Sequence, residues 1–260
     1  GVDGLLGRYF YRAYRKIFST TLGTTCRASA GGLIYFDLQN SLTDIEILKQ
    51  GDYQAAVIAA GITGVGQCEQ DPVLTRKINV EGILRLIDHL QTENIRPIVF
   101  NSTSVFGAQT PESAEQNSFH PLSEYARQKL QVEQAIRSSK RPFIMARLGK
   151  VFGLEPEDKT YLNDIVQKLI SGREVMAAYD EIICPTWIED VVAAVLTLQR
   201  NDFNGDINIC SPEAISRYNL TLMIADVLGC SRNQVVRVAL RDLPNGNRRA
   251  VYNHVDSSRL

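Results

Sequence analysis

Residues 55–61 read Ala55-Ala56-Val57-Ile58-Ala59-Ala60-Gly61, an apolar run of strand length that ends in a glycine. A continuous apolar run of this kind is typical of a strand buried on both faces, as in a parallel sheet. A second such run, Ile98 to Phe100, ends in the polar stretch Asn101-Ser102-Thr103-Ser104. We therefore expect two buried parallel strands, with polar groups placed where the second one ends.

A long helix is predicted between these two strands. Asp71 followed by Pro72 supplies an N-cap and a first-turn proline. The apolar residues after this start keep helical spacing, at Ile78, Ile83, Ile87 and Leu90. A strand, a crossover helix and a second strand form the unit from which parallel sheets are built.

The rest of the chain repeats this alternation. Further helices are expected at 5–18, 43–48, 122–138, 161–170, 190–198 and 220–228, and further strands at 21–27, 33–37, 143–148, 174–178 and 206–209. Alternation of this kind predicts an α/β fold, a doubly wound parallel sheet of the Rossmann type with right-handed crossovers. After Gly153 the rhythm loosens, which indicates a smaller, interleaved α+β lobe.

Composition limits the function classes. The 260 residues are 44% hydrophobic and 22% charged, which is ordinary for a soluble globular enzyme. A net charge of −1 argues against nucleic-acid and membrane-surface partners. No apolar run approaches a membrane span and no secretion signal opens the chain, so a cytoplasmic protein is expected. The five cysteines are scattered and share no metal-ligand spacing with the histidines, so we expect free thiols and no metal site.

The first seven residues carry a glycine at every third position, Gly1, Gly4 and Gly7, and the first predicted helix starts at Leu5. Glycine permits a sharp turn and the close approach of a diphosphate, while a helix N-terminus presents N–H groups and a positive dipole. Leu5 and Leu6 would then pack against the sheet. The pattern favours a dinucleotide-binding turn, with an ordinary surface loop as the alternative.

A dinucleotide turn normally follows a buried strand, and no residue precedes Gly1 in this sequence. Either the first strand of the sheet is missing, or the turn is of another kind. Because the other strand and helix signals are intact, we expect a missing first strand.

Tyr125 and Lys129 stand four residues apart in the helix predicted at 122–138, so they share one face of it. Ser102 stands at the carboxyl end of a predicted strand, where open α/β sheets place their ligands. A nearby ammonium favours the phenolate form of a tyrosine. Tyr125 would then exchange a proton with a substrate oxygen that Ser102 holds. The alternative is a surface helix with a half-buried tyrosine and a solvated lysine.

Together these motifs resemble the extended short-chain dehydrogenase/reductase family, in its sugar-nucleotide reductase and epimerase branch. The resemblance covers nearly the whole chain. The matching segments are Gly1 to Gly7, Asp37-Leu38, Ala59-Ala60-Gly61, Ile78-Asn79-Val80-Glu81-Gly82, Ser102 to Gly107, Tyr125 with Lys129, Arg147 to Gly153, Pro185 to Val191 and Asp256 to Leu260.

The resemblance implies an NAD(P)-dependent oxidoreductase that reduces a nucleotide-linked keto-sugar. The implied catalytic residues are Ser102, Tyr125 and Lys129. The implied cofactor contacts are Gly1, Gly4, Leu5, Leu6, Gly7, Asp37, Leu38, Ala59, Ala60, Gly61, Asn79, Tyr125 and Lys129, and Arg27 is a further cofactor candidate for the reason given below. The implied substrate contacts are Ser102, Tyr125 and Thr186. Of the adjacent pair Arg248 and Arg249, one is expected to hold the sugar nucleotide, because guanidinium groups bind diphosphates in bidentate fashion, and Arg248 is the candidate chosen. Residues 1–153, with 185–209 returning to them, would form the dinucleotide-binding domain, and 154–184 with 210–260 the substrate lobe.

Departures from the family pattern narrow the reaction. Thr103 and Ser104 stand where family dehydratases carry an Asp-Glu pair, so elimination of water lacks its acid–base groups. Cys26-Arg27 ends the second predicted strand, where an acidic residue would bind a ribose hydroxyl and an arginine suits a 2′-phosphate. NADP(H) is therefore favoured over NAD(H). A sugar-nucleotide epimerase, an NADP-binding regulatory subunit without turnover, and a homodimer remain open.

Overall fold

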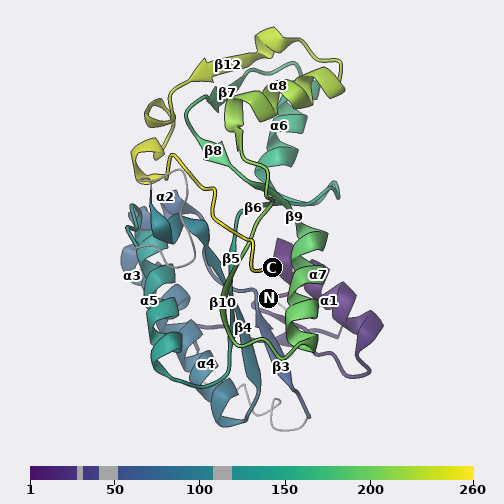
Figure 1. Cartoon of the computed structure of the whole chain (residues 1–260), viewed down its shortest axis with the longest axis vertical. Coiled ribbons are helices and arrows are strands. Elements are labelled where there is room, and N and C mark those ends of the chain that lie inside the picture. Colours follow the sequence, from purple (N-terminus) through teal and green to yellow (C-terminus); the bar gives the residue numbers. More distant parts are fainter. Residues whose placement is uncertain (28–31, 41–51, 108–118) are drawn as a thin grey trace. The chain divides into compact units, whose positions relative to one another are not determined.

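The computed structural model describes residues 1–27, 32–40, 52–107 and 119–260 (Figure 1). The chain divides into two compact units. The first comprises Gly1–Asn101, Glu124–Ala146 and Val192–Ile207, and the second comprises Ser102–Ser123, Arg147–Val191 and Asn208–Leu260. The domain boundaries expected from the sequence stay a prediction, and the helix expected at 43–48 lies outside the described residues.

Within the described residues, the first unit is built on a four-stranded sheet with the strand order β10-β5-β4-β3. The strands are β3 (Ala55–Ile58), β4 (Arg96–Ser102), β5 (Ile144–Leu148) and β10 (Gly205–Ile209). β3 and β4 pair in parallel, with Ile58 opposite Val99. Two short strands, β1 (Thr24–Thr25) and β2 (Ile34–Tyr35), form a separate parallel pair.

Helices cover both faces of the four-stranded sheet (Figure 1). α1 (Leu5–Ile17) and α7 (Ile188–Arg200) lie on one side, and α4 (Ile83–Thr92) and α5 (Glu124–Ser138) lie on the other. The predicted α/β class and the parallel pairing are thereby confirmed. Apolar side chains that are nearly inaccessible form the core of this unit: Leu38, Ile58, Val80, Ile83, Ile87, Leu90, Ile95, Val99, Val132, Ile136, Phe143 and Met145. Burial of each such side chain stabilises the fold by about 1.5–3 kcal/mol. The core therefore fixes the positions of the strand ends.

The long helix predicted from Asp71 contains a wider turn. After α2 (Val65–Gln70), α3 (Pro72–Arg76) leads into a π-helical turn (Lys77–Gly82), and α4 follows. The Asp71 carboxylate caps α3 by accepting a hydrogen bond of 3.0 Å from Leu74 N, as the sequence predicted. Apolar spacing does not reveal the π turn, because a single wider turn shifts the later positions by only one residue.

The second unit, over its described residues, holds three two-stranded sheets. They are β6 (Lys150–Phe152) with β9 (Pro185–Trp187), β7 (Val175–Ala178) with β12 (Val235–Val238), and β8 (Ile182–Ile183) with β11 (Ile215–Ser216). The first two pairs are parallel and the third is antiparallel. The helical turns are α6 (Tyr161–Ile170), α8 (Arg217–Val227), and four short 3-10 turns at Thr103–Phe106, Arg232–Gln234, Leu240–Asp242 and Gly246–Arg248.

A small core joins the helices and strands of the second unit. α6 and α8 contribute Ile165, Leu169 and Ala225, which pack with Val175 of β7 and Val235 of β12. Each helix starts at a hydroxyl cap. Thr160 accepts from Asn163 N at 3.4 Å, and Ser216 accepts from Asn219 N at 3.1 Å.

Candidate active site

The glycine turn at the start of α1 is tightly folded. Gly4 N donates a hydrogen bond of 3.4 Å to Gly1 O. A Cβ added to Gly7 would lie 1.9 Å from Gly1 O, so only glycine permits this close approach. A Cβ on Gly1 or Gly4 would lie 3.9 Å from Ala59 O, which places the end of β3 against the turn.

The N-terminus of α1 is suited to an anion. Within the described residues, no side chain caps the helix at Gly4, and its first turn carries no acidic residue. The first N–H groups of a helix have no partner inside the helix, and the helix dipole adds positive potential there. A diphosphate is the ligand class that such a turn binds in dinucleotide sites.

Two contacts join the glycine turn to β1. Val2 N donates to Thr24 O at 2.8 Å, and the Thr25 hydroxyl donates to the Asp3 carboxylate. Arg27 N in turn donates to the Thr25 hydroxyl at 3.1 Å. The exposed Arg27 is therefore tied through Thr25 to the segment that carries the glycine turn.

A buried asparagine fixes the chain just after β3. Gly61 has a φ of +133°, and a Cβ there would lie 2.8 Å from Asn79 Oδ1. Asn79 Oδ1 accepts from Ile62 N at 2.7 Å, while its Nδ2 donates to Ile62 O at 2.9 Å. The π-helical turn presents Asn79 for these two bonds. The structure thus brings one group of predicted cofactor residues together: Gly1, Gly4, Gly7, Ala59, Ala60, Gly61 and Asn79.

Arg27 and Asp37 leave the same end of a strand pair. β1 and β2 are parallel, with Thr25 opposite Tyr35, so the residues that follow them lie at one edge. The Asp37 carboxylate accepts from Gln39 N at 2.9 Å. Leu38 is buried and packs in the core of the first unit.

Tyr125 and Lys129 lie on one face of α5, as predicted. Lys129 Nζ lies 5.9 Å from the centre of the Tyr125 ring and donates a hydrogen bond of 2.9 Å to Phe100 O in β4. Burial lowers the pKa of Lys129 to about 8. Burial also raises the pKa of the Tyr125 phenol, opposite to the direction expected from a nearby ammonium. The neutral phenol is therefore favoured, and this is the form that donates a proton.

A buried polar network connects α5 to neighbouring segments, and the sequence patterns singled out neither Gln128 nor Glu133. Gln128 is fully buried; its Oε1 accepts from Asn79 Nδ2 at 2.9 Å, and its Nε2 donates to Thr75 Oγ1 at 3.0 Å. One turn further on, the buried Glu133 accepts a hydrogen bond from Asn101 Nδ2. The signal in the sequence is a polar residue on the apolar side of the helix that carries Tyr125 and Lys129.

Ser102 closes β4 and belongs to the second unit, whereas Tyr125 and Lys129 belong to the first. Its hydroxyl accepts from Ser104 N at 3.2 Å and so caps the 3-10 turn that follows. Thr103 is buried inside this turn.

The two remaining substrate candidates have different surroundings. Thr186 is buried; its hydroxyl donates to Cys184 O at 3.1 Å and accepts from Ser211 N at 3.2 Å, so it stabilises the local fold. Arg248 is exposed at the end of a 3-10 turn. Its neighbour Arg249 instead makes an ion pair with Glu181.

Glu181 is the centre of a basic cluster that the sequence reasoning missed. The carboxylate is 4% exposed and pairs with both Arg249 and Arg217, the latter at 3.3 Å. The Tyr161 ring lies 5.5 Å from Lys150 Nζ and 5.9 Å from the Arg217 guanidinium. Lys150 is exposed at the start of β6, and the surrounding protein together with the neighbouring Arg217 lowers its pKa. Three cationic groups around one carboxylate leave net positive charge for an anionic ligand.

The described residues include neither a membrane-spanning helix nor a metal-binding cluster. No described helix is both long and apolar enough to cross a membrane. Nor does the described part of the chain bring together three or more histidine, cysteine, aspartate or glutamate side chains that would hold a metal ion.

Comparison with known proteins places the chain in a family. The family described as RmlD substrate binding domain matches residues 1–260. A "Probable low-salt glycan biosynthesis reductase" of Haloferax volcanii is 22% identical over 94% of this chain and 83% of its own length. The methionine adenosyltransferase 2 subunit beta of Xenopus tropicalis is 22% identical over 87% of this chain and 70% of its own length.

A solved structure supports the same fold. The dTDP-4-dehydrorhamnose reductase of Bacillus anthracis in complex with NADP superposes with a TM-score of 0.82 over 99% of this chain and 88% of its own. The two sequences are 16% identical, so this likeness concerns the fold. This chain is thus a distant relative of dTDP-4-dehydrorhamnose reductase within the extended short-chain dehydrogenases/reductases. Since the family match spans every residue, the chain belongs to the RmlD substrate-binding-domain family.

Proposed function

We propose that this protein is an NAD(P)-dependent reductase of a nucleotide-linked keto-sugar. The observation that carries the proposal lies in the first unit. A glycine turn at an uncapped helix N-terminus and a Tyr125–Lys129 pair with a neutral phenol occur in one compact unit of parallel-sheet architecture. Membership of the RmlD substrate-binding-domain family supports the same reaction class.

The residues of the glycine turn fit a dinucleotide. A Cβ at Gly7 would clash with Gly1 O and one at Gly61 with Asn79 Oδ1, so glycine at these two positions lets the turn fold tightly and the chain after β3 pack against Asn79. The N–H groups of the first turn of α1 would hold the diphosphate. When bound, the nicotinamide supplies the hydride for the reduction. Arg27 favours a 2′-phosphate and thus NADP(H), which is also the ligand named for the Bacillus anthracis structure.

Reduction of a ketone to an alcohol requires a proton as well as a hydride. Tyr125 would donate its phenolic proton to the substrate oxygen, and burial keeps this phenol protonated at neutral pH. Lys129, held by Phe100 O, would place a cation near the phenolate that remains. Ser102 would orient the substrate oxygen, the role that the family resemblance gives it.

The basic cluster of the second unit would bind the substrate's diphosphate. Lys150, Arg217 and Arg249 supply three cationic groups, and guanidinium groups bind phosphate oxygens in bidentate fashion. Glu181 would hold the two arginines in place. Arg248, the residue expected for this task, would contribute from the exposed side of the same segment.

Two other functions would use the same fold. An epimerase would remove the hydride and return it to the opposite face of the sugar carbon. A regulatory subunit would bind NADP without turnover, and the likeness to a protein named as a subunit of methionine adenosyltransferase favours this alternative over the epimerase.

A panel of nucleotide sugars, with NADPH or NADH, tests the proposal. A reductase oxidises the added cofactor steadily with one keto-sugar, and Tyr125→Phe abolishes this oxidation. Interconversion of sugars without net change in cofactor would indicate an epimerase. Cofactor binding without any turnover across the panel would contradict catalysis and favour the regulatory subunit.

A further inference from the structure

A fully buried amide directly precedes Lys129 in α5. Gln128 has no exposed surface, and its side chain makes hydrogen bonds in three directions. Its Nε2 donates to Thr75 Oγ1 at 3.0 Å and to Glu124 Oε1 at 3.1 Å. Its Oε1 accepts from Asn79 Nδ2 at 2.9 Å. The amide therefore uses both of its N–H groups and its oxygen, as a buried amide must.

The directions of these hydrogen bonds leave one orientation for each amide. The Thr75 hydroxyl donates its hydrogen to Asp71 O at 2.8 Å, so it presents only an acceptor to Gln128. Ile62 N is a donor, so Asn79 must turn its Oδ1 towards it, at 2.7 Å, and its Nδ2 towards Gln128. Gln128 satisfies both neighbours because it has a donor on one side and an acceptor on the other. A directed chain of bonds therefore runs from the cap of α3 through α5 to the segment after β3.

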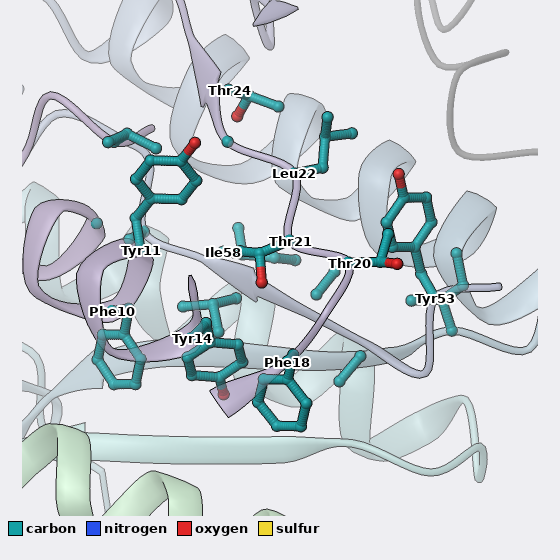
Figure 2. A pocket seen from close by; sticks show the side chains of 18 of the residues that line it. Phe10, Tyr11, Tyr14, Phe18, Thr20, Thr21, Leu22, Thr24, Tyr53 and Ile58 are labelled. Carbon is teal, nitrogen blue, oxygen red and sulfur yellow. The ribbon is translucent and has the colours of Figure 1, made fainter. Parts of the chain in front are cut away.

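The chain of bonds ends beside residues that are expected to contact the cofactor. Asn79 bonds both the N and the O of Ile62, directly after Gly61, at 2.7 and 2.9 Å. On the side of α1, a groove of about 560 Å³ borders β3, and Ile58 and Ala59 line it (Figure 2). Packing on the groove side is therefore incomplete, and the two hydrogen bonds of Asn79 fix the position of the segment after β3.

We propose that Gln128 is a positioning residue, which holds Asn79 in the orientation that places the segment after β3 for the cofactor. The inference rests on the proposed function, in which residues 59–61 contact the cofactor. An apolar side chain in place of Gln128 would leave one N–H of the Asn79 amide without an acceptor, and an unpaired buried donor is costly. Because α5 also carries Tyr125 and Lys129, the same bond sets the helix of the proton donor against the cofactor segment.

The test makes the same replacement at two glutamines of α5. Gln128→Met keeps the length of the side chain and removes its three bonds, whereas Gln131→Met removes an exposed bond of 2.6 Å from Arg76 Nη1. Calorimetric titration measures NADPH affinity, and hydrogen exchange is followed at the Ile62 amide and in β4. We expect Gln128→Met to bind NADPH at least about tenfold more weakly and to exchange the Ile62 amide at least about tenfold faster. Gln131→Met should change neither value.

Three further comparisons separate positioning from general stability. In Gln128→Met, exchange in β4 should stay unchanged; an equal increase there and at Ile62 overturns the proposal, because it indicates a global loss of stability. If Gln128 acts through Asn79, Gln128→Met in an Asn79→Ala background weakens NADPH binding no further, whereas additive losses overturn the proposal. Gln128→Glu keeps an oxygen for Asn79 and, as the protonated acid, an O–H donor, so it should retain most of the wild-type affinity.

The outcome does not depend on one variant or on catalysis. If Gln128→Met does not fold, Gln128→Asn takes its place in every comparison, because its amide is one methylene too short to reach Asn79. If the wild type binds neither NADPH nor NADH, the proposed function fails. Exchange at Ile62 then decides the positioning role by itself: faster exchange in Gln128→Met alone supports it, and equal exchange in the wild type and Gln128→Met overturns it.

Discussion

Replacing Gly7 by alanine is expected to destabilise the first unit, whereas the same replacement at Gly4 is expected to leave its stability nearly unchanged. At Gly7 the new Cβ would lie 1.9 Å from Gly1 O and 2.8 Å from Gly1 C. At Gly4 the nearest atoms are Gly1 O at 3.8 Å and Ala59 O at 3.9 Å, which are ordinary van der Waals distances. The two variants therefore add the same methyl group to the same turn with different consequences.

The size of the effect at Gly7 follows from the displacement. The Gly1 backbone must move by about 1 Å before the contact becomes tolerable, and overpacking of this kind costs about 1–3 kcal/mol. Alanine gains up to about 1 kcal/mol over glycine within a helix, which offsets part of this loss. A net loss of about 1–2 kcal/mol corresponds to a melting temperature about 2–8 °C lower.

Thermal unfolding of the wild type and both variants measures the stability difference, and calorimetric titration with NADPH measures cofactor binding. Gly7→Ala should also bind NADPH more weakly, because the displaced Gly1 backbone forms part of the turn. A Gly7→Ala variant as stable as Gly4→Ala would refute the close approach of Gly7 to Gly1.

Three further predictions concern Tyr125, Arg27 and Lys129. Tyr125→Phe should leave NADPH binding intact and reduce turnover at least about 100-fold, because general acids contribute about 10²–10⁴-fold; wild-type turnover would exclude Tyr125 as the proton donor. Arg27→Asp should shift the ratio of NADPH to NADH affinity towards NADH, and an unchanged ratio would place Arg27 away from the adenine ribose. Lys129, whose pKa burial lowers to about 8, should contribute a rise of up to about 3 kcal/mol in the free energy of unfolding between pH 8 and 10.5, because its unfolded form holds a proton that its native form lacks. Burial raises the pKa values of Tyr125, Tyr161 and Cys68, which opposes this rise towards pH 10.5, so the wild type is compared with Lys129→Met in urea titrations; the same pH dependence in both would contradict the lowered Lys129 pKa.

Long periodic segments of the fold were predictable, and short ones were not. The run at β3, the capped start at Asp71 and the helix α6 (Tyr161–Ile170) follow from apolar spacing and cap residues, and the structure places elements there. β8 and β11 contain two residues each. Two residues carry no alternation, so such strands form because tertiary contacts bring them together rather than because of local preference.

The candidate site likewise has parts that are local in sequence and parts that only the fold brings together. The glycine turn and the Tyr125–Lys129 pair are local in sequence, so spacing alone identifies them. The basic cluster joins Lys150, Glu181 and Arg217 with Arg249, and no local pattern links residues so far apart. Sequence reasoning selected Arg248 from an adjacent pair, but the ion pair with Glu181 is made by Arg249. Nothing in two consecutive arginines tells which one faces a buried carboxylate, because that choice depends on how the 3-10 turn ending at Arg248 directs each side chain.

The Tyr125 pKa shows why the spacing of two residues does not determine their protonation states. Spacing places an ammonium near the phenol, and that alone predicts a lowered phenol pKa. The structure adds burial around both groups and a carbonyl partner, Phe100 O, for the lysine. Burial disfavours each charged form, so it raises the pKa of the phenol and lowers that of the lysine. A phenol kept neutral in this way can donate a proton to a substrate oxygen, and the desolvation that keeps it neutral is a tertiary property that the four-residue spacing does not report.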